Sequence, residues 1–199
     1  MKKLIIYSAF LILITIGCKE EATITDPMEV VNKYFEYHNA HDIDKTLALF
    51  SDSVVFVMDD KNRSTGKDVM RKLERWNAAI YGQLSIPRMM ITGDTVLMTK
   101  ITEVNQWYLS LGIDSVVYRG GTYAIVKEGL IIEMRPSLLE RNSAIEATAR
   151  LKQFIKWASD NRTVEIVNMM PNGQFDFKPQ NAPKWLELMR EWRTETDDN

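Results

Sequence analysis

The fold is decided by the stretch TYAIVKEGLIIEMR at residues 122–135. β-branched and aromatic side chains recur there on both sides of Glu128-Gly129, a dipeptide typical of a tight turn. The stretch therefore predicts a hairpin of two strands, 115–127 and 130–138, with one face of each strand turned toward a core.

Two further strands are expected before the hairpin, at residues 84–91 and 95–108, with Gly93-Asp94 as the turn between them. Successive strands joined by short turns pair antiparallel. The middle of the chain is therefore expected to form an antiparallel meander.

Helices are predicted ahead of these strands. Asp26, Pro27 and Glu29 have the spacing of a helix cap with proline at the first helical position. The helix that follows buries a face made of Val30, Val31, Tyr34, Phe35, Tyr37 and His38. Further patterns predict a helix at 42–50, a strand at 54–58, and a helix after Gly66 in which Val69, Leu73, Trp76 and Ile80 recur at helical spacing. Helices followed by a sheet predict an α+β domain.

The order of these elements resembles the nuclear transport factor 2-like (NTF2-like) superfamily, which includes ketosteroid isomerases and SnoaL-like cyclases. The resemblance covers Asp26 to Leu139 and predicts a domain at 26–141. It is carried by Tyr34 to Asp42, by LFSDSVVF at 49–56, by GKDVM at 66–70 and by TYAIVKEGLI at 122–131. It implies a cone-shaped, curved antiparallel sheet wrapped around the N-terminal helices, a pocket at the open end, and often a dimer through the outer face of the sheet.

The resemblance also implies where catalytic groups belong. A ketosteroid isomerase uses a carboxylate base together with a tyrosine and a protonated aspartic acid that stabilise an oxyanion. The tyrosine matches Tyr34, but the base matches Met58 and the acidic donor matches Thr122. Methionine cannot transfer protons, so these substitutions argue against isomerase chemistry, and the loss of the acid at Thr122 argues against cyclase chemistry.

Other inward-facing groups remain. With Thr122 inward, strand alternation also turns Tyr118, Ala124, Ile132, Met134 and Leu138 inward, and the family register turns Thr99, Ile101, Glu103, Asn105 and Trp107 inward. Glu103, among apolar side chains, is the best candidate for a general acid or base, and His38 and Tyr34 are the other catalytic candidates. The predicted ligand site comprises Tyr34, His38, Met58, Trp76, Glu103, Trp107, Tyr118, Thr122 and Met134. The alternative is that these side chains are ordinary core residues with satisfied hydrogen bonds.

Composition excludes several function classes. The 25 basic and 27 acidic residues nearly balance, which disfavours a nucleic-acid partner. Two histidines and one cysteine form no readable transition-metal motif, and Asp59-Asp60 is typical of a solvated turn, so neither a metal nor another cofactor is predicted.

The first residues resemble a bacterial lipoprotein leader. Lys2 and Lys3 precede an apolar run, Leu4 to Ile16, which is too short to span a bilayer and typical of a signal peptide at 1–17. The run ends at Gly17-Cys18, which resembles a lipobox in which Cys18 is acylated, although Thr15 stands where leucine is usual. Residues 18–25 then form a tether, and Lys19-Glu20-Glu21 resembles the Bacteroidetes signal for the outer membrane. The expected partner is the lipid bilayer of the cell envelope, and the alternative is an ordinary signal peptide.

Residues 142–199 extend beyond the usual family length. A capped helix near Ser143, a strand at 163–169 and a helix from Pro183 are predicted. Their apolar residues should dock on the domain, either as a lid on the cone or over the outer sheet face. The second arrangement would favour a monomer over a homodimer.

Two function classes remain open. The first, favoured because both matching acidic catalytic positions are lost, is a non-catalytic module that binds a small apolar ligand or an envelope partner. The other is a lyase, isomerase or hydrolase that acts on a small hydrophobic molecule with Glu103 or His38 as its acid or base. A cavity of about 300 Å³ or more lined by Tyr34 and Glu103 would favour the enzyme.

Replacing Cys18 by serine tests the anchor. Because Cys18→Ser removes the acylated sulfur, the protein should move from the membrane fraction to the soluble fraction of its host and lose incorporation of labelled palmitate. Substitution of the neighbouring Lys19 by alanine is the control and should leave both measurements unchanged. A Cys18→Ser protein that still incorporates labelled palmitate contradicts acylation at Cys18.

Overall fold

The computed structural model describes residues 25–58 and 61–197. The predicted signal peptide, Cys18, nearly all of the predicted tether and Asp59-Asp60 lie outside the described residues. In the part of the chain that is described, no helix has both the length and the apolar character needed to cross a membrane.

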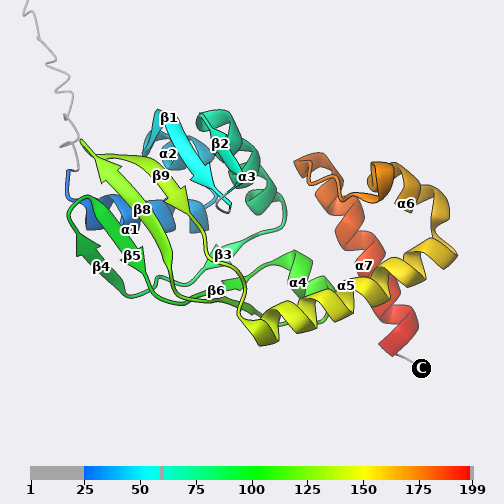
Figure 1. The fold of residues 1–199 in the computed structure, drawn as a ribbon. Helices are drawn as coiled ribbons and strands as arrows, with labels where there is room; N and C mark the ends of the chain where they lie inside the picture. The colour runs from blue at the N-terminus through cyan, green and yellow to red at the C-terminus, as the bar shows by residue number, and fades with distance from the viewer. Residues whose placement is uncertain (1–24, 59–60, 198–199) are drawn as a thin grey trace, which may run out of the picture.

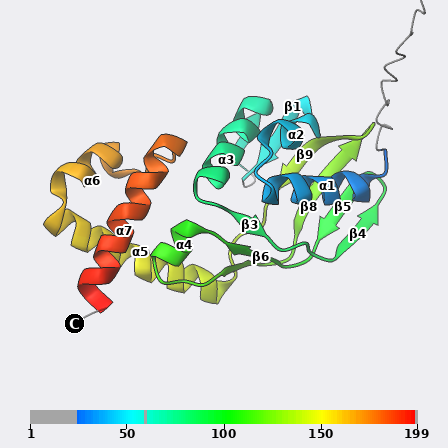
Figure 2. The ribbon, with the colours of Figure 1, turned by 180° about the vertical axis from the view of Figure 1, so that it is seen from behind.

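Three helices begin the domain, as predicted. Helix α1 (Pro27–Asn39) is capped by Asp26, whose carboxylate accepts a hydrogen bond from the backbone N–H of Met28. Helices α2 (Ile43–Ala48) and α3 (Lys67–Ala79) follow. Helix α1 lies across the inner face of the main sheet, as the two opposite views in Figures 1 and 2 show.

The main sheet has six strands in the order β2-β1-β9-β8-β5-β4. Their bounds are β1 (Phe50–Val57), β2 (Arg63–Thr65), β4 (Met89–Thr92), β5 (Thr95–Met98), β8 (Thr122–Lys127) and β9 (Leu130–Arg135). The antiparallel order β9-β8-β5-β4 is the predicted meander. Strand β1 instead pairs parallel to β9, so the sheet is mixed. The α+β fold class is confirmed.

The long predicted strands are broken into shorter ones. A second sheet, in the order β3-β6-β7, takes β3 (Gln83–Leu84), β6 (Ile101–Val104) and β7 (Val116–Tyr118). The prediction of a continuous strand at 95–108 is wrong at its end, because residues 106–110 form helix α4 (Gln106–Ser110). Asn105 causes the change: its side-chain oxygen accepts a hydrogen bond from the backbone N–H of Tyr108 and so caps the helix.

A bulge corrects the predicted register of the last strand. The β8–β9 pairing shifts between Ile125 and Val126, so Ile131 rather than Ile132 is fully buried. Leu138, which was expected to face inward, lies beyond β9 and is largely exposed.

The regular elements of the C-terminal extension are all helices. It comprises α5 (Arg141–Asn161), α6 (Thr163–Met169), α7 (Ala182–Asp197) and two short 3₁₀ turns, η1 (Pro171–Gly173) and η2 (Pro179–Asn181). The predicted strand at 163–169 is wrong: Ile166 and Met169, three residues apart, are buried, while Val164 and Val167 are exposed, which is a helical pattern. Ser143 lies inside α5, where its hydroxyl accepts a hydrogen bond from Val117 N–H.

The extension docks on one end of the cone. Its aromatic core, built around Phe154, Trp185 and Trp192, joins Trp107 and Leu111 of the α4 segment. Helix α7 passes so close to the end of α4 that a Cβ on Gly112, whose φ is +79°, would lie 1.9 Å from Nη1 of Arg193. The positive φ favours glycine here, and a larger residue would also have to displace the Arg193 guanidinium.

The outer face of the main sheet is left uncovered by the extension. Met90 and Leu97 pair across β4 and β5, and both are exposed. Of the two arrangements expected for the extension, the one in which it shields this face, and thereby favours a monomer, does not match the structure.

Trp185→Ala should destabilise the protein strongly. The indole is fully buried among Trp107, Phe154 and Phe175, and its removal leaves a large cavity, so we expect a loss of about 3–5 kcal/mol in the free energy of unfolding by urea denaturation. Trp185→Phe is the matched control. Among the described residues the indole Nε1 of Trp185 has no hydrogen-bond partner, so phenylalanine keeps much of the packing without an unpaired donor and should cost far less. Equal losses would contradict the packing role.

Candidate functional site

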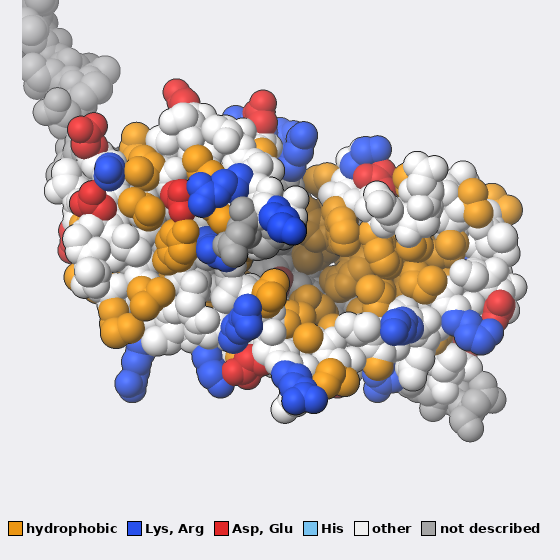
Figure 3. Space-filling model, viewed as in Figure 1, with side chains coloured by type: hydrophobic (Ala, Val, Ile, Leu, Met, Phe, Trp, Pro, Cys, Tyr) orange, Lys and Arg blue, Asp and Glu red, His pale blue; other side chains and the backbone are white. Residues whose placement is uncertain are grey.

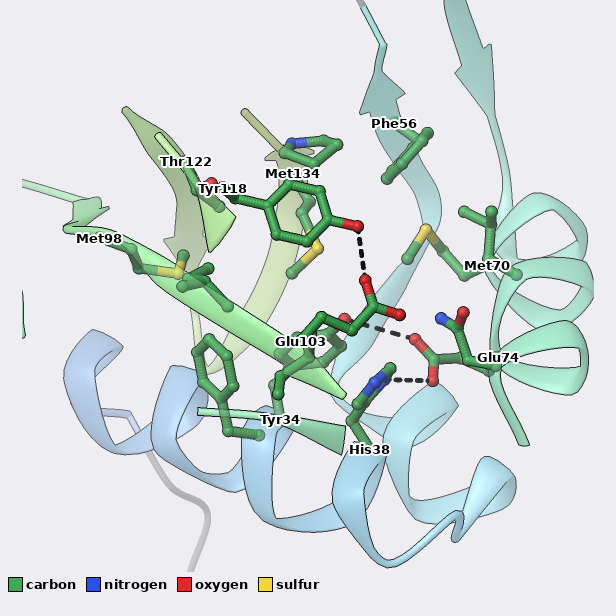
Figure 4. A pocket seen from close by; sticks show the side chains of 16 residues that line it. Tyr34, His38, Phe56, Met70, Glu74, Met98, Glu103, Tyr118, Thr122 and Met134 are labelled. Atoms are coloured by element: carbon green, nitrogen blue, oxygen red, sulfur yellow. Dashed lines mark hydrogen bonds and ion pairs between the residues drawn. The ribbon is translucent and has the colours of Figure 1, made fainter. Parts of the chain in front are cut away.

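The cone holds a small apolar cavity of about 220 Å³ that both Tyr34 and Glu103 line. The lining is as expected for the enzyme, but the volume is below the size of about 300 Å³ that would favour it. Helices α1 and α3 and strands from both sheets supply its walls. The lining residues are Tyr34, Phe35, His38, Phe56, Met70, Leu73, Glu74, Asn77, Leu84, Met98, Ile101, Glu103, Tyr118, Thr122, Met134 and Pro136. Two carboxylates, an imidazole and two phenols are thus the ionisable groups of a wall that is otherwise mostly apolar (Figure 4).

Glu103 is held on the cavity wall by two neutral donors. It lies on β6 two residues after Ile101, so strand alternation turns both side chains inward, and it is 8% exposed. The hydroxyl of Tyr118 donates to Oε2 at 2.5 Å, and the amide of Asn105 donates to Oε1 at 2.5 Å. These bonds offset the cost of burying the carboxylate.

A second carboxylate, Glu74, pairs with His38. Nδ1 of His38 lies 2.8 Å from Oε2 of Glu74, and the residues are 3% and 5% exposed. Tyr34, one turn before His38 on α1, donates a longer hydrogen bond of 3.4 Å to Oε1 of Glu74. Figure 4 shows Glu74 reaching from α3 toward both α1 side chains.

The tyrosines of the site are held as neutral phenols. Burial, followed by the charge of Glu74, raises the pKa of Tyr34 well above its usual value. Burial and the nearby Glu103 likewise raise the pKa of Tyr118. A neutral hydroxyl next to a carboxylate is a hydrogen-bond donor, so both tyrosines can also donate to an oxygen atom of a ligand.

A second cavity, of about 340 Å³, lies between the cone and the extension. Its lining residues are Trp76, Asn77, Ile80, Glu103, Asn105, Trp107, Tyr108, Leu111, Tyr118, Ala147, Thr148, Leu151 and Phe177. Figure 3 shows a hollow lined by apolar side chains between the two lobes of the molecule.

The predicted site residues are distributed over these two cavities. Tyr34, His38, Glu103, Tyr118, Thr122 and Met134 meet in the cone cavity. Trp76 and Trp107 line the second cavity. Met58 lines neither, because β1 ends at Val57 and the Met58 side chain is 62% exposed.

Thr122 lies in the cone cavity but is already hydrogen bonded. Its Oγ1 donates to Oγ of Ser137 at 3.1 Å and accepts from the Ser137 backbone N–H at 3.0 Å. The enzymes that this sequence resembles have a carboxylic acid at this position. The Thr122 hydroxyl that replaces it here is hydrogen bonded to Ser137 instead.

Glu74 was missed by the sequence analysis. The predicted face of its helix was Val69, Leu73, Trp76 and Ile80, and these residues are buried or partly buried. The structure also buries Met70 and Glu74, four residues apart, which the prediction did not include. A glutamate in line with a buried methionine was the available signal, but in most helices such a residue is solvated.

The described residues hold no group of three His, Cys, Asp or Glu side chains placed to bind a metal ion.

Comparison with known proteins identifies the fold. No family model and no curated protein matches the sequence. Among solved structures, the chain is similar to the epoxide hydrolase/cyclase-like enzyme SalBIII of salinomycin pyran-ring formation, at 17% identity over 59% of this chain and 92% of that one, with a TM-score of 0.51. It is also similar to an LEH-like epoxide hydrolase of Mycobacterium tuberculosis, at 17% identity over 65% and 94%, with a TM-score of 0.50. An NTF2-like protein of unknown function from Cytophaga hutchinsonii has 8% identity over 62% and 98%, with a TM-score of 0.47. The fold of the domain is NTF2-like.

Tyr108, beside the site, provides a spectroscopic probe of Glu103. Burial and the charge of Glu103 raise the pKa of Tyr108 to about 12. In Glu103→Gln the charge is gone but the burial remains, so the pKa of Tyr108 should fall and stay above its usual value. The measurement is phenolate absorbance against pH, with the matching Tyr108→Phe protein subtracted to isolate this residue.

The raised pKa of Tyr108 also makes the stability of the folded protein depend on pH. Between the usual tyrosine pKa and about pH 12, the unfolded chain loses the Tyr108 proton while the folded chain keeps it, so stability falls as pH rises through this window. Tyr108→Phe should flatten that part of the curve. An unchanged Tyr108 midpoint in Glu103→Gln would show that burial alone sets the pKa.

Proposed function

We propose that this chain is an acid–base enzyme that opens a small, neutral, largely apolar oxygen-containing molecule, an epoxide being the class best suited to the site. One observation carries the proposal: two buried carboxylates, Glu103 and Glu74, line one small apolar cavity, each with its own set of hydrogen-bonding partners.

Glu103 is suited to act as the general base. A carboxylate has about four acceptor positions on its two oxygens, and Tyr118 and Asn105 occupy two of them. The remaining positions can accept a proton from water or substrate. Both donors fix the orientation of the carboxylate, which favours proton transfer in a defined direction.

The His38–Glu74 pair is suited to supply the proton. A hydrogen bond of 2.8 Å between Nδ1 and Oε2 requires a proton between the two groups. Tyr34 extends this group, since its neutral hydroxyl makes only a long bond to Glu74 and can donate to a substrate oxygen. Acid and base thus reach the cavity from different elements, Glu103 from β6 and the pair from α1 and α3.

Epoxide hydrolysis uses both groups. Glu103 takes a proton from a water molecule as the water oxygen bonds to a ring carbon. The ring carbon–oxygen bond breaks, and the ring oxygen takes a proton from the Tyr34–Glu74–His38 group, giving a diol. The proton on Glu103 then returns to that group through solvent. Two neighbours of the same fold are named as epoxide hydrolases or hydrolase-like enzymes, which makes this the first reaction to test.

A second candidate is non-catalytic binding of a small apolar ligand. It is favoured by Thr122, whose hydroxyl is engaged with Ser137, and by the methionines Met70, Met98 and Met134 on the cavity wall. The same cavity then acts as a receptor, and Glu103 orients a hydroxyl of the ligand. A protein that binds epoxides without converting them would favour this candidate.

The location of the enzyme is part of the proposal. The leader and Cys18 support export and lipid anchoring in the outer membrane of a cell envelope, with the domain held at the membrane surface.

Glu103→Gln should abolish turnover. Loss of the base should lower the rate of 1,2-epoxybutane hydrolysis to the diol by at least about 100-fold, measured by gas chromatography. Glu128→Gln, an exposed carboxylate in the β8–β9 turn, is the matched control and should keep the wild-type rate.

A conservative change in the proton-donating group should lower the rate of hydrolysis less than the loss of the base does. Tyr34→Phe keeps the ring packing and should lower the same rate by about 10-fold or more. Absence of turnover in the wild type with measurable epoxide binding rejects the enzyme, and full activity in Glu103→Gln rejects the assigned base.

A further inference from the structure

We propose that the second cavity, between the cone and the C-terminal extension, binds the apolar tail of an elongated substrate whose reactive end lies at Glu103. This inference rests on the proposed function for the position of the reactive end. It adds the substrate class, a neutral molecule with an alkyl tail, and assigns a role to the extension.

The two cavities meet at a common wall. Asn77, Glu103 and Tyr118 line both of them, so the carboxylate of Glu103 borders the cone cavity and the second cavity together. A ligand whose oxygen lies at Glu103 can therefore have its carbon chain in the cone cavity or in the second cavity.

The size of the cone cavity requires an additional space for most ligands. At about 220 Å³ it is smaller than the range of about 300–1,000 Å³ typical of small-molecule sites. The second cavity, at about 340 Å³, falls within that range. A reactive group in the cone cavity leaves little room there for a long tail, and the second cavity offers that room.

Most polar side chains of the second cavity lie at the common wall, where Asn105 and Tyr118 bond to Glu103 and Tyr108 lies near enough for the Glu103 charge to raise its pKa. Away from that wall the lining is aromatic and aliphatic apart from Thr148 of α5. Trp76 lies 5.6 Å from Trp107 and 5.1 Å from Phe177, measured between ring centroids.

The extension supplies the apolar wall opposite the cone. Ala147 and Leu151 come from α5, and Phe177, which is 56% exposed, lies between the 3₁₀ turns η1 and η2. A large exposed aromatic side chain at the edge of an apolar hollow gains burial when an alkyl chain lies against it. Glu103 is the ionised group in this lining, so a neutral tail is favoured over an anionic one.

The test is the affinity of 1-alkanols from butanol to decanol, measured by isothermal titration calorimetry. Their hydroxyl can donate to Glu103, and each added methylene that enters the second cavity should lower Kd about fourfold. Thr148→Trp fills the cavity from an exposed position of α5 and should remove the gain for the longer chains while butanol binds as before. Ala149→Trp, also exposed on α5 but outside the cavity, is the matched control and should behave as wild type.

A second variant removes a wall rather than filling the space. Phe177→Ala should weaken decanol binding and leave butanol binding unchanged. Thermal denaturation of all three variants verifies that each is folded.

The outcomes separate this inference from the proposed function. No gain with chain length, an equal gain in Thr148→Trp, or no alkanol binding at all overturns the tail site, whatever the epoxide activity. If the gain is present and lost in Thr148→Trp while Glu103→Gln still hydrolyses epoxybutane, the tail site stands and the assigned base is wrong.

Discussion

The hydrogen bond between Asn105 and Glu103 connects the candidate site in the cone with helix α4, on which the C-terminal extension packs. Through its amide nitrogen Asn105 donates to the buried carboxylate, and through its amide oxygen it caps helix α4. Without such donors burial of the carboxylate would be costly, and the cap stabilises the turn from strand to helix at this point by about 1 kcal/mol. One side chain therefore fixes both the candidate base and the start of α4.

The extension depends on that turn. Helix α4 carries Trp107, which contacts Phe175 and Trp185, and it leads to Gly112, where α7 crosses. A continuous strand would have placed these residues on alternating sides of a sheet and left the apolar residues of α5 and α7 without a partner. The candidate site and the docking of the extension are thus connected by a segment of a few residues.

Much of the fold was predictable because its signals are local. The Asp26 cap and the hairpin around Glu128-Gly129 follow from short-range patterns, whereas the inward direction of Glu103 was implied by the family resemblance; the structure has all three. The mixed pairing was not predictable, since the parallel contact of β1 with β9 joins segments far apart in the sequence. Helix α6 was misjudged because Val164, Ile166 and Val167 have high strand propensity, and the burial that overrides this propensity depends on tertiary packing.

The site was predictable only where it followed strand register or helix spacing. Tyr34 and His38 lie one turn apart on α1 and were found together, whereas Glu74 was missed because its partner His38 lies 36 residues away in the sequence. Met58 was misplaced because the alignment implied by the resemblance ran one residue past the end of β1. Pairing between distant charged groups has no short-range signature, and it is the pairing that keeps Glu74 in the cavity.

The parallel pairing of β1 with β9 also constrains the order of folding. Phe56 on β1 and Met134 on β9 are register partners and both line the cone cavity, yet nearly the whole domain lies between them in the chain. Closing so long a loop is entropically costly, and contacts of this range generally form late. Helices α1 to α3 and the β4–β5 hairpin can form from local contacts, but the cavity acquires its full wall only when β9 has joined β1. Assembly of the binding site is therefore tied to completion of the domain, so a chain interrupted before β9 retains local structure without a pocket.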